Sequence, residues 1–327
     1  MKLVTGAGGF IGSNLVAALE AMGHKIAVCD WLDAPEKMRN LENRRIAERI
    51  SPDGLLAFLR ERAGEIETVF HMGAISSTTE TNAGLINETN VTLPMQIWMW
   101  CRDNEVPLIY ASSAATYGDG ALGFHDDDSL QALQRLQPLN LYGQSKNTFD
   151  IWVAEQVAGR AAAPPQWAGL KFFNVYGPNE YHKGGQMSVV PQIFKQISET
   201  GRARLFRSHN PNYEDGGQSR DFVWVGDCVE VMLWLEAQPT VSGVFNCGTG
   251  QARSFLDLAN AVFQALGKDA LIDYVPTPEA IRDKYQYFTE ANMAKLRAVG
   301  YDRSFTSLEN GVGRYVTEHL MLEDAYL

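Results

Sequence analysis

One tyrosine, one lysine and one serine in this sequence form a set that could remove the proton of an alcohol. Tyr142 and Lys146 are separated by four positions, which places both side chains on one face of a helix. A phenol titrates at about pH 10, but a nearby ammonium favours the phenolate and lowers that pKa. Ser113 follows a predicted strand over residues 107–112 and can hydrogen-bond the same substrate oxygen. We therefore predict that Tyr142 is a general base, with Lys146 and Ser113 in support.

A glycine-rich turn near the start of the chain is typical of a dinucleotide site. Residues 5–12 read Thr-Gly-Ala-Gly-Gly-Phe-Ile-Gly and lie between a predicted strand and a predicted helix, with glycines at Gly6, Gly9 and Gly12. A tight turn needs residues without a Cβ atom, and the N–H groups that open the helix attract a pyrophosphate. An acid, Asp30, follows Gly12 after 18 residues. At that place a carboxylate would bind the ribose 2′-hydroxyl of NAD.

The choice between NAD and NADP stays open on these residues. Asp30 would repel a 2′-phosphate, which favours NAD, but Lys37 and Arg39 are close in the sequence and could offset that charge. A further predicted strand ends at His71, which could contact the cofactor or simply belong to the edge of the core. Small residues after it would let the cofactor lie against the backbone, at Met72, Gly73 and Ala74.

Short β-branched runs alternate with longer amphipathic ones through the first half of the chain. This pattern predicts an α/β fold of the Rossmann type, a doubly wound parallel sheet with helices on both faces. We expect residues 1–172 to form the dinucleotide-binding domain, with residues 219–250 rejoining its sheet. Residues 173–218 and 251–327 are less regular and are expected to form a smaller, mixed α/β lobe that binds substrate.

Composition and charge exclude several classes of function. Of 327 residues, 45% are hydrophobic and 20% charged, as in ordinary globular proteins. The net charge of −11 would repel a phosphate backbone, so no nucleic-acid partner is expected. No metal site is predicted, because the four cysteines are far apart and form no Cys-x-x-Cys pair. We expect a cytoplasmic protein without a membrane partner, and a solvated loop at the acidic residues 126–128.

These residues together resemble the extended short-chain dehydrogenase/reductase superfamily, which includes nucleotide-sugar epimerases and dehydratases. The resemblance extends to Phe173–Pro178 and Arg220–Asp227 and covers nearly the whole chain. Sugar dehydratases of this group carry an Asp-Glu pair after the first serine, where the acid protonates a departing hydroxyl. Ala114 and Ala115 stand there and cannot donate a proton, so we expect oxidation and reduction without β-elimination.

A closer resemblance, to the family of ADP-heptose 6-epimerases, rests on five short segments. They are 76–80, 111–118, 182–184, 285–289 and 296–302. The resemblance implies epimerisation at C6 of an ADP-linked heptose through a transient 6-keto sugar, in lipopolysaccharide core heptose synthesis. It also implies that Lys183, in the His-Lys-Gly motif, is a second catalytic residue beside Tyr142. Two bases suit this chemistry, because hydride must return to the opposite face of a planar ketone. Lys183 could instead only bind phosphate.

The same resemblance implies which residues bind the two ligands. Cofactor contacts would come from Phe10, Ile11, Asp30, Trp31, Lys37, Ser76, Asn90, Lys146 and Val175. Substrate contacts would come from Ser113, Asn174, Gly185, Gln192, Phe206, Arg220 and Tyr285. The family normally holds NADP and forms homo-oligomers. Four positions depart from its usual pattern, namely Trp31, Pro52, Gly185 and Gln192.

Two other functions remain open at this point. The first is a 4-epimerase or reductase that acts on another nucleotide-diphosphate sugar, which the same Tyr142 and Lys146 would serve. The second is a nucleotide-sensing binding module without catalysis, since a fold does not determine its function. The sugar, the nucleotide and the number of subunits are not determined by these residues.

Overall fold

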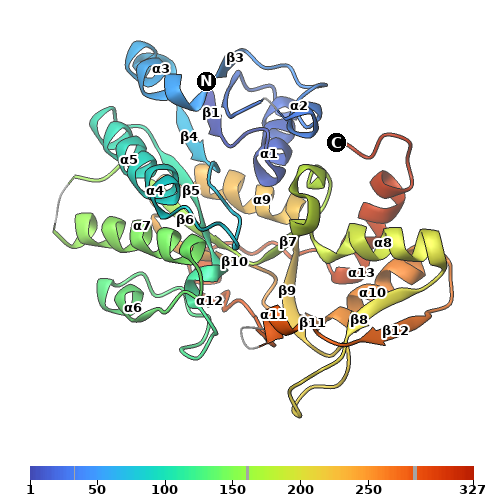
Figure 1. The fold of residues 1–327 in the computed structure, drawn as a ribbon. Coiled ribbons are helices and arrows are strands. Elements are labelled where there is room, and N and C mark those ends of the chain that lie inside the picture. Colours follow the sequence, from blue (N-terminus) through green and yellow to red (C-terminus); the bar gives the residue numbers. More distant parts are fainter. Residues whose placement is uncertain (33, 160–161, 283–285) are drawn as a thin grey trace.

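A seven-stranded parallel sheet forms the centre of the computed structural model, which describes residues 1–32, 34–159, 162–282 and 286–327 (Figure 1). Its strands lie in the order β10 (Gly243–Cys247), β6 (Trp167–Phe172), β5 (Leu108–Ser113), β4 (Thr68–His71), β1 (Lys2–Thr5), β2 (Ile26–Cys29) and β3 (Glu48–Ile50). All neighbouring pairs in this sheet are parallel. The predicted doubly wound α/β fold is confirmed.

The strand order reverses beside β1, and this reversal determines where a ligand can bind. β1 pairs with β2 on one side and with β4 on the other, so that Thr5 lies beside both Cys29 and His71. The chain builds one half of the sheet outward from β1 and then returns to start the other half at β4. The connections therefore leave the two strands in opposite directions and open a crevice at their carboxyl ends, where ligands bind in such sheets.

Helices cover both faces of the sheet, and its central strands are therefore buried on both sides. Helices α1 (Phe10–Ala21) and α9 (Val225–Glu236) pack together on one face, around Leu15, Phe70 and Val229. Helices α3 (Leu55–Glu61), α5 (Leu93–Asp103) and α7 (Leu141–Ala158) cover the other face, around Leu59, Val69 and Trp98. The short helices are α2 (Pro35–Arg39), α4 (Ala83–Asn87), α6 (Leu130–Arg135), α11 (Glu279–Arg282) and α12 (Ala294–Ala298).

A smaller lobe with its own core follows β6. It contains the sheet β11 (Ala252–Ser254), β9 (Ser219–Trp224) and β7 (Asn174–Tyr176), and the pair β8 (Ala203–Phe206) and β12 (Ile272–Val275). Helices α8 (Val189–Thr200), α10 (Phe255–Ala265) and α13 (Leu308–Tyr315) pack around them. The expectation that residues 219–250 rejoin the main sheet is wrong for β9. The place beside β6 is taken by β10, and β9 pairs instead with β7 and β11.

The acidic residues 126–128 close the outer edge of β10. The backbone N–H of Asn246 donates to Asp126 over 2.8 Å, and that of Val244 donates to Asp128 over 2.9 Å. Lys295 forms an ion pair with Asp128 at 2.7 Å. The prediction of a solvated loop is therefore wrong for Asp126, which is buried because its carboxylate satisfies a strand that has no further neighbour.

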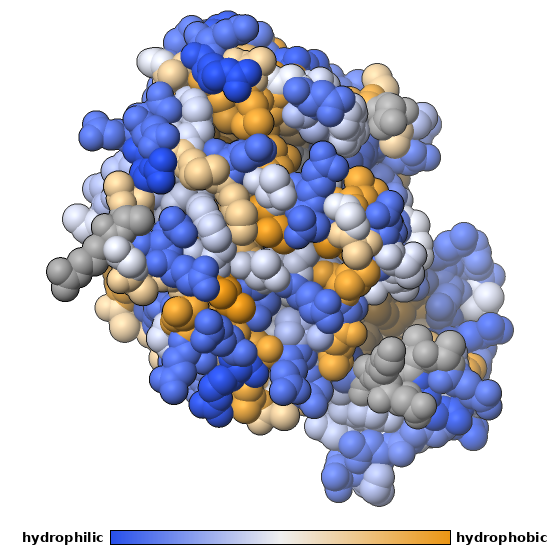
Figure 2. All heavy atoms as spheres, turned by 60° about the vertical axis from the view of Figure 1, so that its left-hand side comes forward, coloured by the Kyte–Doolittle hydropathy of each residue, from blue (hydrophilic) through white to orange (hydrophobic). Residues whose placement is uncertain are grey.

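Hydrophilic residues dominate the face of the molecule drawn in Figure 2. Figure 2, which brings the α5 and α7 side of Figure 1 forward, shows apolar side chains in separate patches among them. None of the helices in the described ranges is long and apolar enough to cross a membrane.

Candidate active site

The turn between β1 and α1 has the shape of a phosphate cradle. Gly6 has a φ of +63°, and a Cβ atom on it would lie 2.5 Å from the Cα of Gly73. A Cβ atom on Gly12 would lie 2.2 Å from the carbonyl oxygen of Gly6. Gly9 caps α1 without a side-chain hydrogen bond, so the N–H groups of the first turn, at Phe10 and Ile11, remain available to a ligand. The turn therefore fits the pyrophosphate of a dinucleotide.

Asp30 lies at the end of β2 with both carboxylate oxygens engaged. It accepts hydrogen bonds from the backbone N–H groups of Gly8, over 2.9 Å, and Trp31, over 2.7 Å. Lys37 pairs with it at 2.9 Å. Trp31 itself is exposed. The charge of Asp30 is thus offset by a lysine at the place where the adenosine ribose of a dinucleotide would lie.

The loop after β4 is held close to the glycine turn. The N–H of Gly73 donates to the Thr5 hydroxyl, and Asn90 bonds both the N–H, at 2.8 Å, and the carbonyl, at 2.9 Å, of Ile75. Asn90 lies in a π-helical turn, Glu88–Thr92, a feature that often marks functional sites. The cofactor positions that this loop carries or adjoins are Met72, Gly73, Ala74 and Ser76.

His71 remains neutral in this environment. Burial, together with the nearby charge of Lys146, lowers the pKa of His71 to about 3. Its Nδ1 lies 2.7 Å from the Thr5 hydroxyl. These contacts favour the interpretation of His71 as a residue of the core edge.

The predicted catalytic set meets between β5 and α7. Ser113 ends β5, and its hydroxyl lies close enough to the phenol of Tyr142 to lower the pKa of that phenol. Lys146 donates to the carbonyl of Ala111 over 2.8 Å. Gly143 permits this closeness, since a Cβ atom on it would lie 2.6 Å from the carbonyl oxygen of Ala115. The spacing inferred from the sequence therefore brings Ser113, Tyr142 and Lys146 together.

Burial sets the charges of this group. It raises the pKa of Tyr142, while the hydrogen bond from Ser113 lowers that pKa and Asp150 raises it. Burial lowers the pKa of Lys146 to about 8, against the opposing effect of Asp150. Lys146 is therefore mostly an ammonium at neutral pH. The phenol keeps its proton until a further positive charge approaches.

Lys183 lies apart from this group, against the start of α1. Its Nζ is 5.4 Å from the ring centre of Phe10, and burial lowers its pKa while Glu180 raises it. It belongs to the 3₁₀ segment Tyr181–Gln186, which also contains Gly185. In the described part of the chain no direct contact joins Lys183 and Tyr142. The two candidate bases thus come from different elements.

A polar cluster that the sequence does not predict connects His182, next to Lys183, with the glycine turn. The amide of Asn40 donates to the carbonyls of Gly8, over 2.8 Å, and Asn179, over 3.1 Å, and lies 3.3 Å from His182. Asn40 is 1% exposed. No signal for it exists in the sequence, because its partners are as many as 142 positions away.

Residues 324–327 fold over the same region. Tyr181 donates to the carbonyl of Ala325 over 2.9 Å, and the N–H of Leu327 donates to the side chain of Asn179 over 2.9 Å. Arg39 pairs with Asp324 at 2.9 Å. These contacts link α2 of the cofactor side with the segment that carries Lys183.

The residues expected to bind substrate come from several elements of the smaller lobe. Asn174 and Val175 begin β7, parallel to β9, which carries Arg220. Arg220 donates to the backbone carbonyls of Ser219 and Gln286. Phe206 ends β8, and Gln192 on α8 donates to the carbonyls of Met187 and Ser188. Tyr285 lies outside the described residues.

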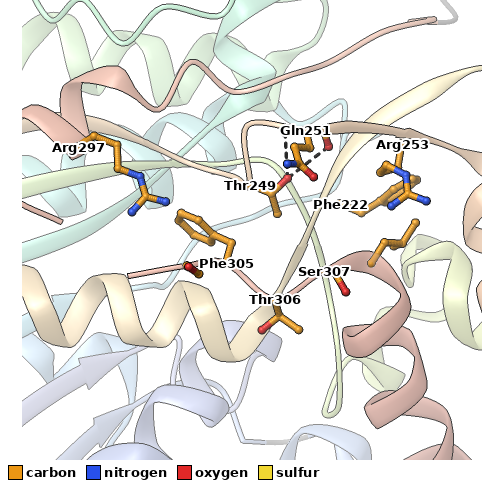
Figure 3. Close-up of a pocket in the computed structure, with 10 residues that line it drawn as sticks. Phe222, Thr249, Gln251, Arg253, Arg297, Phe305, Thr306 and Ser307 are labelled. Carbon is orange, nitrogen blue, oxygen red and sulfur yellow. Dashed lines mark hydrogen bonds between the residues drawn. The ribbon is translucent and has the colours of Figure 1, made fainter. Parts of the chain in front are cut away.

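Two cavities lie beside the loop after β10. One of about 340 Å³ is bounded by Phe222, Arg253 and Phe305 (Figure 3), and one of about 480 Å³ is bounded by Phe124 and Phe288. They share Thr249 and Arg297, and none of the predicted catalytic residues lines either cavity. Within the described ranges, no group of three or more His, Cys, Asp or Glu side chains could hold a metal ion.

Comparisons with known proteins agree with this geometry. Residues 2–248 match the model of the NAD dependent epimerase/dehydratase family. The ADP-L-glycero-D-manno-heptose-6-epimerase of Nitratidesulfovibrio vulgaris strain DP4 is 48% identical over the full length of both chains. The crystal structure of the enzyme of that name from Helicobacter pylori has a TM-score of 0.78 and 25% identity, over 97% of this chain and 95% of its own. A protein named MoeE5, solved with UDP-glucose and NAD, has a TM-score of 0.71 and 25% identity, over 95% of both chains.

The glycine turn can be tested by one added methyl group. We expect Gly12→Ala to weaken dinucleotide binding by about ten- to a hundredfold, because the new Cβ atom must displace the Gly6 carbonyl. Fluorescence titration with reduced dinucleotide measures this. Gly64→Ala is the matched control, since its Cβ atom meets nothing within 4 Å. Equal affinity in both variants would contradict the assignment of the turn.

Proposed function

The chain belongs to the NAD dependent epimerase/dehydratase family, and we propose that it interconverts the two C6 epimers of ADP-glycero-D-manno-heptose. The observation that carries this proposal is the meeting of Ser113, Tyr142 and Lys146 in a chain 48% identical to a protein named for that reaction. Ala114 and Ala115, in the turn after Ser113, supply no acid for elimination. The reaction is therefore an isomerisation with no net redox change.

A nicotinamide dinucleotide fits the crevice at the end of β1. The positions of Gly6 and Gly12 leave no room for a side chain, and Asp30 with Lys37 lies beyond them. A nicotinamide held there would supply the acceptor, and later the donor, of the hydride from the carbinol carbon. All other steps of the mechanism fall to side chains of this chain.

Tyr142 removes the hydroxyl proton as the carbinol becomes a ketone. Ser113 holds the same oxygen by a hydrogen bond, and Lys146 supplies the positive charge that favours the phenolate. Carbon 6 is exocyclic, so rotation about the bond between C5 and C6 turns the other face of the ketone toward the hydride donor. Return of the hydride to that face gives the second epimer.

Lys183 serves as the acid or base for the epimer whose hydroxyl points away from Tyr142. A lysine acts so only if its pKa is depressed, which burial provides here. Its place against Phe10, at the opening of α1, supports a position beside the bound cofactor. The hydroxyl of one epimer would then face Tyr142, and that of the other would face Lys183.

The remaining residues divide between the two ligands. Residues 1–172 with α9 and β10 bind the dinucleotide, and residues 173–218 and 251–327, together with β9, bind the nucleotide sugar. Arg220 suits the diphosphate, because its planar guanidinium matches two oxygens. Asn174, Phe206, Gln192, Gly185 and Tyr285 complete the substrate lobe. NADP is the proposed cofactor, supported by Lys37, which can both offset Asp30 and meet a 2′-phosphate; NAD is the alternative.

The setting of the reaction follows from its substrate. An ADP-linked heptose epimerase belongs to lipopolysaccharide core synthesis, and we place it in the cytoplasm, where dinucleotides and nucleotide sugars are made. We also propose a homo-oligomer. Size-exclusion chromatography with light scattering determines its number of subunits.

Incubation with ADP-D-glycero-D-manno-heptose tests the reaction itself. We expect the L-glycero epimer to form without net reduction of the dinucleotide, and Tyr142→Phe to lower turnover by about a thousandfold with little change in cofactor affinity. Tyr301→Phe is the matched control, because that buried phenol has no hydrogen-bond partner among the described residues. Turnover of UDP-glucose alone would instead identify a 4-epimerase, and full biological activity of Tyr142→Phe would indicate a binding module.

Lys183→Met tests the second base. The two directions share one equilibrium constant, so kcat/KM of the whole reaction must fall equally in both. A difference between the two epimers is instead expected in the first half-reaction, the oxidation of the sugar. Rapid mixing measures its rate from the formation of reduced dinucleotide with each epimer in turn. Lys183→Met should slow one epimer by about tenfold more than the other, and Tyr142→Phe should show the reverse preference. Equal slowing of both epimers would assign Lys183 to binding alone.

Binding of NAD and NADP to Lys37→Ala tests the cofactor. Loss of this charge should weaken NADP by about tenfold, because a phosphate loses its ion pair, and should change NAD little. Lys25→Ala, at an exposed lysine on the opposite end of β2, is the control. Tighter binding of NAD than NADP by the unaltered protein would establish NAD as the cofactor.

A further inference from the structure

A buried ion pair between α7 and β6 lies next to the candidate catalytic group. Asp150, on α7, and Lys171, on β6, are 2.9 Å apart and are 0% and 1% exposed. Removing two charges from water is costly, and such a pair is seldom retained for stability alone. Neither residue touches the substrate or cofactor positions described above, so the pair calls for another explanation.

The pair connects three elements that carry the reaction. Asp150 accepts hydrogen bonds from Ser112 over 2.7 Å and from Tyr110 over 3.3 Å, both on β5. Lys171 donates to the hydroxyl of Thr116 over 2.7 Å. Thr116 in turn donates to the carbonyl of Ser113 over 2.8 Å. An unbroken chain of polar contacts thus runs from α7 through β6 to the turn that presents Ser113.

The same pair dominates the charge around Lys146. Asp150 follows Lys146 by one helical turn and lies on the same face of α7. The titratable groups around Lys146 are Tyr142 and Asp150 on α7, His71 on β4, Tyr110 on β5 and Lys171 on β6. Burial keeps His71 and both tyrosines neutral at neutral pH. Asp150 and Lys171 are therefore the charges that remain.

We propose that Asp150 and Lys171 are positioning residues, which brace the Ser113 turn against α7 and keep Lys146 in its ammonium form. Asp150 lies one helical turn from Lys146 and attracts its ammonium, and Lys171 pairs with the same carboxylate at 2.9 Å. The hydroxyl of Thr116 connects Lys171 with the carbonyl of Ser113 through its two hydrogen bonds. This inference rests on the proposed function, because the positioned groups are those of the proposed reaction and one of the tests measures its kcat.

The test compares Asp150→Asn, which removes a charge, with Thr116→Val, which removes only hydrogen bonds. In protein labelled with ¹³C at lysine Cε, the Lys146 signal is assigned by its loss in Lys146→Met, and its titration midpoint is measured with dinucleotide bound. We expect Asp150→Asn to lower that midpoint by about one pH unit, because the attraction for the ammonium is lost. The falling limb of kcat at alkaline pH should move down with it.

Thr116→Val should separate bracing from charge. It keeps the shape of the side chain and removes only the two hydrogen bonds, so we expect kcat to fall about tenfold with KM and the Lys146 midpoint unchanged. Glu236→Gln is the matched control. It breaks the ion pair of Glu236 with Lys2, at the opposite end of the sheet, and should change stability without moving the midpoint.

A second variant keeps the test decisive if Asp150→Asn does not fold. The double variant Asp150→Asn with Lys171→Gln retains a hydrogen-bonding pair and leaves no unpaired charge, and it should lower the Lys146 midpoint in the same direction. A midpoint unmoved in the folded charge variants would overturn the inference, whatever their activity. A midpoint that moves in a protein that epimerises no heptose would leave the inference standing and refute the proposed function.

Discussion

The close approach of α7 to the end of β5 is the constraint on which the site depends. Lys146 reaches the carbonyl of Ala111, and a Cβ atom on Gly143 would meet the backbone of Ala115, so the helix approaches the end of the strand closely. This spacing brings a phenol on the helix near the serine that ends the strand. A larger residue at position 143 would move Tyr142 and Lys146 away from Ser113. The candidate catalytic group is therefore formed at one interface between two elements.

The parts of the structure that could be predicted are those determined by local spacing. The glycine turn, the Tyr142 and Lys146 pair and the alternation of strands and helices are short patterns, each with a direct physical reason. The fold class and the meeting of Ser113 with Tyr142 follow from them. The parts that could not be predicted depend on contacts across long separations. Asn40 with His182, and Asp150 with Lys171, leave no local pattern, because each partner lies on another element.

Two errors of prediction have the same origin. Strand β9 looks like the other strands in sequence, and only the position of β10 beside β6 excludes it from the main sheet. Asp126 looks like a solvated acid, and its burial is explained by the hydrogen bond that it accepts from the backbone N–H of Asn246 on the edge strand. In both cases the residue type was interpreted correctly, but its role was determined by a neighbour on another element.

The carboxylates of Asp126 and Asp128 along the edge of β10 also bear on what that edge can bind. A strand at the border of a sheet offers its free N–H groups to any other extended chain, and stacking of such borders leads to filaments. On β10 those groups at Val244 and Asn246 already have acceptors within the molecule. At the other border, β3 has three residues and charged side chains at Glu48 and Arg49. Strand addition at β10 is thereby blocked, and the short, charged edge at β3 offers little to a further strand.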